Sequence, residues 1–407
     1  MTILKYNYKF VIMWINRILS NELIKLATQF PAVILTGPRQ TGKTALLEKT
    51  FSDYNYVTLD FAQNAESAES NPMEFLNNNP APLIIDEIQY APSLLRHLKV
   101  KIDQNRTRNG QFFITGSQSF SLMKQVSESL SGRAAVIEFH GLSYQEILGC
   151  YRYKFPKNNI SFLFRGSFPE LWAHPENPLP INRWYQSYIT TYLERDIRNL
   201  ANIGNLRDFE RFLRVAASRI GQRLNMSDIG RDIGISPTTA KSWFSILQAS
   251  GQIVLLEPYY RSLGKRISKT PKLYFQDTGL AAFLCGYNTP ESIQNAINMG
   301  SFWENHVIGQ WLRWNNWLQP SASLWYWQDQ SKNEIDLIID YQGRLIPIEI
   351  KWKEKPSVKD IKGITAFQKM YGSSVNSFSY IACNTNGTFN ITDQVIAKNG
   401  WDIWEIP

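Results

Sequence analysis

A phosphate-binding loop in residues 32–47 constrains the fold of this chain more than any other stretch. The segment reads AVILTGPRQTGKTALL, so a short apolar run is followed by Gly-x-x-x-x-Gly-Lys-Thr and then by the start of a helical stretch. A strand, a glycine-bracketed loop and a helix in this order turn backbone N–H groups and the positive helix end toward a phosphate chain. A chance glycine turn would lack these flanks. The segment therefore predicts a P-loop α/β fold that binds a nucleoside triphosphate.

Two loop residues have individual roles in this prediction. Lys43 would reach the β- and γ-phosphates, and the Thr44 hydroxyl would bind Mg²⁺, so ATP and Mg²⁺ are the expected cofactors. The residues expected to bind the nucleotide are Gly37, Pro38, Arg39, Gln40, Thr41, Gly42, Lys43 and Thr44.

Two adjacent carboxylates end a later apolar strand. After a strand expected at 56–60, residues 82–87 read PLIIDE and end in Asp86 and Glu87. The carboxyl edge of a parallel sheet is where such folds gather ligand-binding side chains. Asp86 would hold Mg²⁺ through water, and Glu87 would be the general base that polarises the attacking water. The alternative is that both acids only cap the next helix.

Two further polar residues each leave two interpretations open. The strand expected at 111–115 runs into Gly-Ser-Gln, so Ser117 would either sense the γ-phosphate or belong to a polar turn. Arg133 precedes a fifth strand at 135–139. It would either act as an arginine finger in a neighbouring subunit of a homo-oligomer or be a solvated arginine at a helix end. The order of these strands and polar residues resembles the AAA-type branch of P-loop ATPases.

Composition limits the class and setting of the protein. The chain has 407 residues, of which 19% are charged and 13% aromatic, as in an ordinary globular protein of two or three domains. The apolar segment 10–19 contains Asn16 and Arg17, is too short to cross a bilayer and lacks a cleavage site, so no membrane span or signal peptide is expected. The three cysteines are too widely spaced for a zinc site and favour a reduced, cytoplasmic setting.

The net charge of +8 is concentrated in the middle of the chain. Residues 151–290 contain 19 Lys and Arg against 10 Asp and Glu, whereas both flanking regions are close to neutral. A localised positive field favours a polyanionic partner. Between 261 and 272 five cations occur without an acid, namely Arg261, Lys265, Arg266, Lys269 and Lys272.

Residues 225–251 have the pattern of a helix-turn-helix. A first helix at 226–233 with Ser227 as its cap would turn at Gly234, and Ser236 would cap a second helix at 237–248. The second helix would offer polar side chains to a DNA major groove and pack apolar ones inward. The polar set is Thr238, Thr239, Lys241 and Ser242, and the apolar set is Ala240, Trp243 and Leu247.

Two strands expected at 253–258 and 272–276 would add a wing to this helix-turn-helix. DNA contact is therefore expected through 225–272. The alternative is a helix-turn-helix that only packs against the rest of the protein.

The last third of the chain alternates helices and strands in an order that resembles the PD-(D/E)xK nuclease core. The expected helix, three strands, helix and strand lie at 302–312, 323–328, 335–341, 344–352, 358–371 and 378–383. Glu349 and Lys351 are two residues apart on a strand and share a face. Asp336 and Glu349 would hold Mg²⁺, with Glu304 completing the acidic cluster. Lys351 would orient or deprotonate the attacking water, or stabilise charge on the phosphate. The alternative is a nuclease-like core kept only for binding or packing.

Taken together, the motifs resemble one family, prokaryotic ATP-binding proteins with an AAA-type N-terminal domain and a C-terminal domain of unknown function. That C-terminal domain is similar to a winged helix followed by a nuclease-like fold, and the resemblance covers about residues 15–380. It implies ATP at 37–44 with Asp86 and Glu87, and a nuclease-like cluster in the last third. The motifs that carry it are GPRQTGKT, LIIDEIQ, FFITGSQS, SLSGR, GSFPE, YLERDI, GKRISKTPKLYFQDTGLAAFL, FWENHV, NEIDLII and IPIEIK.

The expected fold class is an α/β P-loop NTPase (AAA-type) domain, followed by a helical winged-helix region and an α/β restriction-endonuclease-like domain. The expected parts are the ATPase domain, a helical connection, the winged helix-turn-helix and the nuclease-like domain, at 1–150, 151–205, 206–290 and 291–407. The expected function is a Mg²⁺-dependent, ATP-hydrolysing protein that binds or acts on DNA, with no membrane association and possible homo-oligomers. One alternative is a non-catalytic, ATP-dependent switch that binds DNA or protein. A second is a remodelling or signalling ATPase whose winged helix only packs.

Overall fold

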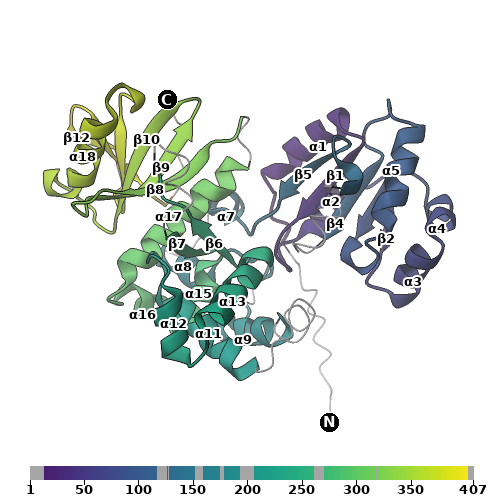
Figure 1. The fold of residues 1–407 in the computed structure, drawn as a ribbon, viewed down its shortest axis with the longest axis horizontal. Coiled ribbons are helices and arrows are strands. Elements are labelled where there is room, and N and C mark those ends of the chain that lie inside the picture. Colours follow the sequence, from purple (N-terminus) through teal and green to yellow (C-terminus); the bar gives the residue numbers. More distant parts are fainter. Residues whose placement is uncertain are drawn as a thin grey trace, which may run out of the picture.

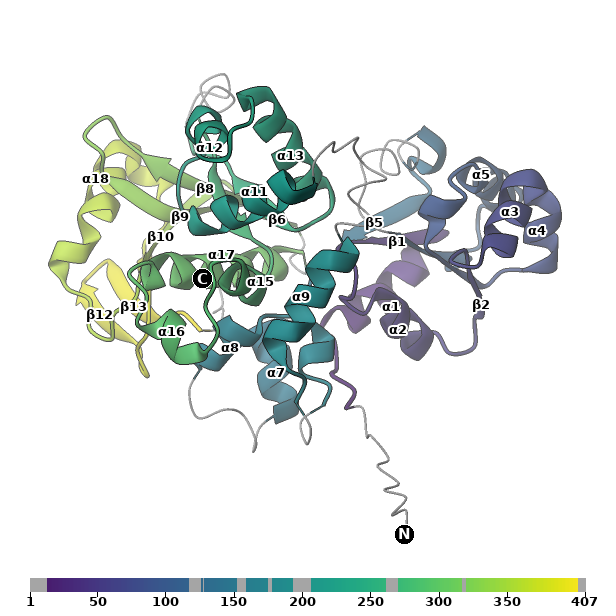
Figure 2. The ribbon, with the colours of Figure 1, turned by 90° about the horizontal axis from the view of Figure 1, so that it is seen from below.

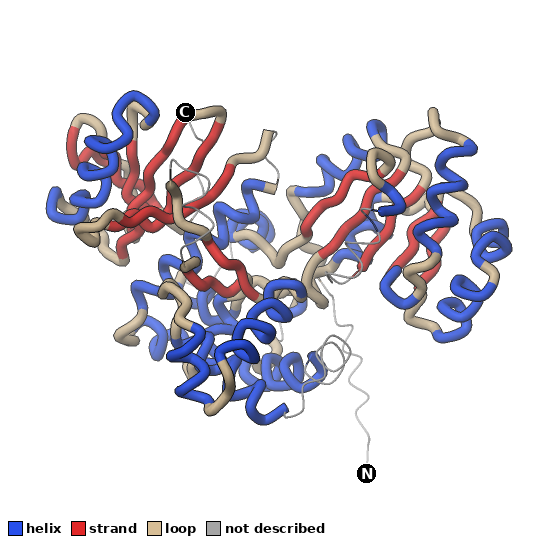
Figure 3. Tube along the Cα trace, in the orientation of Figure 1, coloured by secondary structure: helices blue, strands red, loops and turns tan. Residues whose placement is uncertain are grey.

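The computed structural model describes residues 13–116, 126, 128–151, 159–174, 178–192, 206–260, 270–316 and 320–401. Two sheets lie at opposite sides of the molecule, and a mostly helical middle region lies between and below them (Figure 1). The strands of the N-terminal and C-terminal parts form separate groups, with a short hairpin among the helices of the middle region (Figure 3).

The N-terminal sheet is parallel, with the order β2-β3-β4-β1-β5. Its strands are β1 (Ala32–Thr36), β2 (Asn55–Thr58), β3 (Leu83–Asp86), β4 (Phe112–Gly116) and β5 (Ala134–Glu138). β1, β3 and β4 are buried along their whole length, as apolar strands between two helical layers must be. The five predicted strands are present, with ends within two residues of the prediction.

Helices cover both faces of this sheet. One face packs against α1 (Leu19–Gln29) and α2 (Lys43–Thr50). The other packs against α3 (Ala62–Ser70), α4 (Pro72–Asn78) and α5 (Leu94–Gln104). Side chains alternate along a strand, so Val33 and Leu35 of β1 join the first layer while Ala32 and Ile34 join the second.

The middle region is built mainly from short helices. They are α7 (Tyr144–Tyr151), α8 (Ile160–Arg165), α9 (Ile181–Tyr192), α11 (Leu206–Ser218), α12 (Met226–Ile233), α13 (Pro237–Ala249), α15 (Thr278–Leu284) and α16 (Pro290–Gln294). Between α13 and α15 lies an antiparallel hairpin of β6 (Ile253–Leu256) and β7 (Lys272–Phe275). The 3₁₀ turns of the first two regions are η1 (Ile88–Tyr90) and η2 (Pro169–Leu171).

The ends of α12 and α13 explain their helix-turn-helix arrangement. Asn225, and not Ser227 as predicted, caps α12, because its side chain accepts hydrogen bonds from two N–H groups of the first turn. Gly234 ends α12 in the left-handed conformation, with φ of 83°. Ser236 caps α13 as predicted, accepting from the Thr239 N–H at 3.0 Å. Local side-chain chemistry thus sets both ends of the turn.

The C-terminal part has the predicted order of helix, three strands, helix and strand. These elements are α17 (Met299–Asn315), β8 (Ser323–Gln328), β9 (Glu334–Tyr341), β10 (Arg344–Lys351), α18 (Lys362–Tyr371) and β11 (Ser379–Cys383), with the turns η4 (Val358–Ile361) and η5 (Gly372–Ser374) beside α18. Two more strands, β12 (Phe389–Thr392) and β13 (Val395–Asn399), complete a sheet of order β12-β13-β11-β10-β9-β8.

One hydrophobic core joins the middle region to the C-terminal sheet. Phe212 of α11, Leu280 of α15, Val307 of α17 and Ile348 of β10 belong to the same buried cluster. The core therefore crosses the boundary expected at 290, and the two parts bury apolar surface against each other. In the described ranges, no helix has both the length and the apolar character needed to cross a membrane.

His306, on α17, is enclosed by aromatic rings. Its ring stacks on Trp303 with centroids 5.6 Å apart, and its Nε2 lies 3.0 Å from the Trp401 carbonyl oxygen. Burial lowers the pKa of His306 from 6.5 to about 3. Burial also lowers the pKa of His140, which follows β5, from 6.5 to about 3. Both side chains therefore stay neutral in the folded protein at pH 5.5.

We expect these two histidines to make the protein less stable in weak acid. The unfolded chain gains a proton on each below pH 6.5, whereas the folded protein does not until near pH 3, so stability is lost as the pH falls. Each histidine should remove about 1.4 kcal/mol of unfolding free energy between pH 7.5 and 5.5. Urea unfolding at both pH values measures this loss, which should be smaller by about that amount in His306→Gln. His97→Gln, at a partly exposed site, is the control and should keep the wild-type loss.

Candidate functional site

The phosphate loop occupies residues 37–42, between the end of β1 and the start of α2. Gly37 has a φ of 147°, and a Cβ there would lie 2.0 Å from the Phe139 carbonyl oxygen, so only glycine fits. The Lys43 ammonium donates to the Gly37 carbonyl at 3.0 Å and to the Pro38 carbonyl at 2.8 Å. The Lys43 side chain is thus buried against the phosphate loop.

Asp86 and Thr44 lie together, as predicted. The Thr44 hydroxyl donates to Asp86 Oδ1 at 2.7 Å, and the Thr115 hydroxyl donates to the same oxygen at 2.5 Å. Tyr56 donates to Asp86 Oδ2 at 3.1 Å, and burial together with Asp86 raises the pKa of Tyr56. A hydroxyl and a carboxylate beside a phosphate loop are the hard oxygen ligands that Mg²⁺ prefers. These residues fit Mg²⁺.

Thr115 is a site residue that the sequence interpretation passed over. It is the last residue but one of β4, and its hydroxyl both donates to Asp86 and accepts from the Glu87 N–H at 3.1 Å. The feature of the sequence that could have identified Thr115 is a threonine at the end of an apolar run. Ser117, the residue expected to sense the γ-phosphate, lies outside the described residues.

Glu87 follows β3 and starts the 3₁₀ turn η1 in the left-handed conformation, with φ of 59°. Its side chain makes no capping hydrogen bond, and it accepts from the Gln89 amide. This disfavours the alternative in which Glu87 is only a helix cap. The carboxylate lines the same cavity as Lys43 and Thr44.

Two cavities flank the phosphate loop. The first, of about 480 Å³, is lined by Lys43, Thr44 and Glu87 on one side and by Tyr188 and Thr191 of α9 on the other. Figure 2 shows α9 between the N-terminal sheet and the other middle helices. The cavity at the phosphate loop is therefore completed by the middle region, which the sequence did not reveal.

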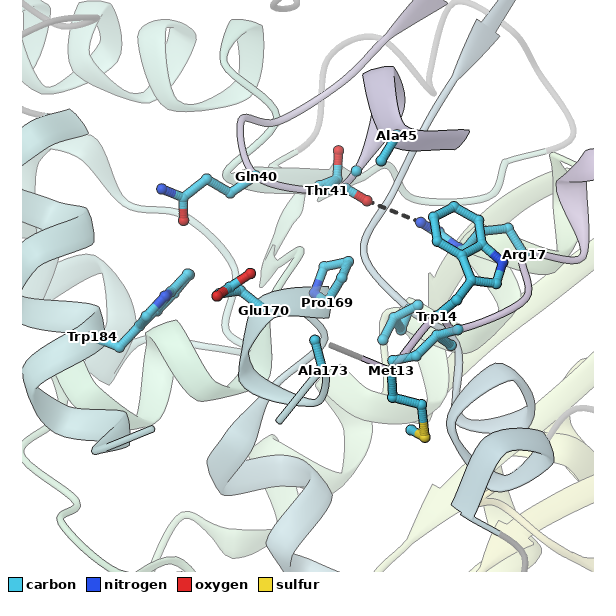
Figure 4. A pocket seen from close by; sticks show the side chains of 13 residues that line it. Met13, Trp14, Arg17, Gln40, Thr41, Ala45, Pro169, Glu170, Ala173 and Trp184 are labelled. Carbon is cyan, nitrogen blue, oxygen red and sulfur yellow. Dashed lines mark hydrogen bonds between the residues drawn. The ribbon is translucent and has the colours of Figure 1, made fainter. Parts of the chain in front are cut away.

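The second cavity, of about 600 Å³, is mostly apolar (Figure 4). Met13 and Trp14 lie at one side of it, Gln40 and Trp184 at the other, and Pro169 between them. It shares Gln40, Gly42 and Ala45 with the first cavity, so both cavities adjoin the phosphate loop.

Arg17 connects the loop to the rest of the protein, which the sequence also did not reveal. Its guanidinium donates to the Thr41 carbonyl at 2.9 Å, the His140 carbonyl at 2.8 Å and Glu146 Oε1 at 3.0 Å (Figure 4 shows the first). It also lies 4.1 Å from the centre of the Phe139 ring. Arg17 and Glu146 are almost fully buried. A buried guanidinium with this many partners fixes the back of the phosphate loop.

Arg133 lies at the other end of the sheet. It precedes β5, its carbonyl accepts from the N–H of Ala32 at the start of β1, and the loop follows the end of β1. Its guanidinium forms a two-point ion pair with Asp103 of α5, at 2.7 and 2.9 Å. This contact favours the helix-end interpretation over the arginine finger, because the side chain already has a partner in its own domain.

The four predicted nuclease-like residues come together. Glu349 Oε1 lies 2.5 Å from the Lys351 ammonium, and Asp336 Oδ2 lies 3.6 Å from it. Glu304 of α17 joins them through Lys272, whose ammonium lies 2.9 Å from Glu304 and 3.4 Å from Asp336. The acidic cluster is thus formed by Glu304, Glu334, Asp336 and Glu349, with Lys272 and Lys351 among its carboxylates.

The prediction that Lys272 is a DNA-facing cation of the wing is wrong. Its side chain is 4% exposed, and all four residues of β7 are buried. Burial alone would lower the pKa of Lys272, but the surrounding carboxylates and Tyr274 raise it above its usual value. Burial raises the pKa of Glu304 to about 7, although Lys272 opposes this shift. Its carboxylate partners Glu304 and Asp336 lie 32 and 64 residues away in the sequence, so no local pattern indicated them.

The acidic cluster does not fit the predicted Mg²⁺. Lysine ammonium groups already contact Asp336 and Glu349, the two expected ligands. Within the described part of the chain, no three His, Cys, Asp or Glu side chains form a group that could hold a metal ion.

The chain matches three domain families. Residues 29–148 match the AAA domain, residues 157–291 a domain of unknown function (DUF8612), and residues 299–403 another domain of unknown function (DUF4143). The N-terminal part is thus a P-loop NTPase domain of the AAA type.

The uncharacterized proteins Rv2008c of Mycobacterium tuberculosis and Mb2031c of Mycobacterium bovis are each 31% identical to this chain over 330 residues, 81% of this chain and 72% of the relative. The chain therefore belongs to the family of these proteins.

Two solved structures resemble parts of the chain. The Walker-type ATPase PABY2304 of Pyrococcus abyssi has 15% identity and a TM-score of 0.47, covering 67% of this chain and 96% of that one. The ORC1 protein of Aeropyrum pernix, solved in complex with DNA, has 12% identity and a TM-score of 0.30, covering 66% of this chain and 91% of that one. These TM-scores are too low to support an argument about function.

Removing Arg17 should destabilise the protein strongly. Arg17→Met leaves Glu146 buried without its cation, which typically costs about 3–5 kcal/mol. Urea unfolding at pH 7.5 measures the change. Arg133→Met is the matched control, because its ion pair with Asp103 is on the surface and should contribute little. Equal losses in the two variants would contradict the role given to Arg17.

Proposed function

We propose that this protein binds ATP with Mg²⁺ in its AAA domain, hydrolyses it, and binds DNA through the helix-turn-helix of its middle region. The carrying observation for the ATPase is the hydrogen-bonded group of Thr44, Asp86 and Thr115 next to the cavity that Lys43 and Glu87 line. The start of α2 and the ends of β3 and β4 bring these groups to one place, as phosphoryl transfer by positioning requires.

Each residue has a task in this proposal. Lys43 binds the β- and γ-phosphates, and Glu87 polarises the attacking water, which as general-base catalysis typically contributes about 10²–10⁴-fold. Thr44 and Asp86 hold Mg²⁺, which offsets the charge that develops on the phosphates. The Thr115 hydroxyl fixes the Asp86 side chain and the Glu87 backbone at once.

The apolar cavity supports a site for the nucleotide base. Trp14 and Trp184 offer aromatic surface at opposite sides of the cavity, Met13 lies beside Trp14, and Pro169 lies between the two sides. A planar, apolar base beside the phosphate loop fits such a lining, since binding pockets are mostly apolar with a few polar groups. The base and the phosphates would then lie on the two sides of Gly42.

The exposed face of α13 supports the DNA-binding part. Thr238, Lys241 and Ser242 are exposed, while the predicted inward residues Trp243 and Leu247 are buried. An exposed polar face beginning at the N-terminal end of the second helix is what major-groove reading requires. The positive charge of the middle region favours phosphate contact.

The alternatives remain testable. The buried β7 supports a helix-turn-helix that only packs, and the DNA measurement below separates that alternative from ours. Because Arg133 is paired with Asp103, our proposal does not include an arginine finger. We retain the expected domain limits as part of the proposal, with the nuclease-like domain as a fold that does not cut DNA.

Substitutions at the loop should separate binding from hydrolysis. Lys43→Ala should weaken ATP binding, because the phosphates lose their charged partner. Glu87→Gln should keep binding and lower the hydrolysis rate by about 10²-fold or more, because it loses the general base. Isothermal titration and phosphate release measure the two properties. Glu74→Gln, an exposed acid on α4, is the control. Wild-type turnover in Glu87→Gln would contradict the role of Glu87.

Reversing a charge on α13 should weaken DNA binding. We expect Lys241→Glu to lower affinity for a DNA duplex several-fold and to reduce its salt dependence, since one phosphate contact is lost. Fluorescence anisotropy over a salt series measures both. Lys369→Glu makes the same change at an exposed site on α18 and should leave affinity nearly unchanged. No duplex binding by the wild type would support the packing alternative.

A further inference from the structure

Lys272 lies at the centre of the acidic cluster in the C-terminal part of the protein. Its ammonium is 2.5 Å from Glu334, 2.9 Å from Glu304 and 3.4 Å from Asp336. These carboxylates come from β9 and α17, whereas the lysine comes from the hairpin of the middle region. One cation thus contacts three acids from two other elements.

Each carboxylate of the cluster already has a lysine ammonium as a partner. Asp336 uses Oδ1 for Lys272 and Oδ2 for the Ile350 N–H, at 2.9 Å. Glu304 Oε1 accepts from Lys272 and, at 2.5 Å, from the Tyr274 hydroxyl. Glu349 Oε1 contacts Lys351, which leaves Glu349 Oε2 as a buried oxygen without a hydrogen-bond partner. A Mg²⁺ ion here would have to displace an ammonium group that already balances the carboxylates, whereas the partners of Asp86 at the phosphate loop are neutral hydroxyls.

The fold holds Lys272 in place from both sides. The Tyr326 hydroxyl donates to the Thr270 carbonyl at 2.6 Å, two residues before the lysine. Three residues after it, Phe275 exchanges two backbone hydrogen bonds with the Asn305 side chain, at 2.7 and 2.9 Å. The ammonium is therefore a built part of the cluster and not the end of a mobile surface chain.

We propose that Lys272 is the resident cation of this cluster and takes the place that a nuclease-like site gives to its divalent metal ion. The ion pairs of the cluster then attach the middle hairpin to the C-terminal sheet. In this proposal the cluster neither binds a divalent metal nor cuts DNA. A buried ammonium among carboxylates gives such a joint its specificity, because breaking it leaves uncompensated charge. This inference holds whether or not the protein hydrolyses ATP or binds DNA.

Mn²⁺ binding tests the inference directly. Full-length, nucleotide-free protein carrying Lys43→Ala and Thr44→Ala, which remove the phosphate-loop ligands, is titrated with Mn²⁺ and followed by electron paramagnetic resonance. We expect no saturable site in this background. Adding Lys272→Met and Glu334→Gln together removes one positive and one negative charge and leaves Glu304, Asp336 and Glu349 in place. We expect this variant to bind one Mn²⁺ saturably, at least tenfold more tightly than the detection limit set by the background protein, and Asp336→Asn to abolish that binding.

Two outcomes would overturn the inference. One is a saturable Mn²⁺ site in the Lys272-containing protein that Asp336→Asn or Glu349→Gln removes. The other is a folded Lys272→Met, Glu334→Gln variant, checked by circular dichroism, that still binds no Mn²⁺. Because the first measurement needs no change at Lys272, the inference can fail even where the lysine variant does not fold. A plasmid-cleavage assay with Mn²⁺ adds a second readout, for which we expect no cleavage by the wild type.

Discussion

The buried Arg17 guanidinium is the interaction on which the nucleotide site depends. It joins the segment before α1 to the Thr41 carbonyl of the phosphate loop and to Glu146 of α7. Burying two charges is favourable only when geometry and further hydrogen bonds compensate for lost hydration, and the His140 carbonyl supplies one such bond. Arg17 therefore connects the phosphate loop to α7, the helix at the end of the AAA domain. The phosphate loop and the attachment of the middle region share this anchor.

The middle region also closes the front of the site. Trp184 and Tyr188 of α9 stack with ring planes 8° apart, and the first lines the apolar cavity while the second lines the phosphate cavity. The Gln252 amide, between α13 and β6, donates to the Tyr188 hydroxyl at 3.0 Å. A direct physical contact thus runs from the nucleotide cavities to the segment that follows the candidate DNA-binding helix. Packed side chains and hydrogen bonds of this kind can carry energetic coupling between two sites.

Buried charges also hold the other regions together. Arg313 of α17 donates to the Gln276 carbonyl at 2.7 Å and to the Ser167 hydroxyl at 3.2 Å, and burial lowers the pKa of Arg313 to about 10. Lys272 plays the corresponding part between β7 and the C-terminal sheet. The apolar core that crosses this boundary supplies the stability, and these polar contacts fix the relative placement of the parts.

The sequence by itself determined what depends on near neighbours: the loop around Lys43, the strand ending in Asp86, the order of elements in the last third, and the capping of α13 by Ser236. These features follow from periodicity, glycine conformation and side chains a few residues apart. Only the tertiary structure decided which charges meet. Arg17 and Glu146 are 129 residues apart, and Lys272 and Glu304 are 32 apart, so no local pattern marks either pair. Lys272 was expected to face DNA because it follows other cations in the sequence, yet burial beside carboxylates from α17 and β9 gives it the opposite environment. The partner of a buried charge can lie far away in the sequence, so it follows only from the complete fold.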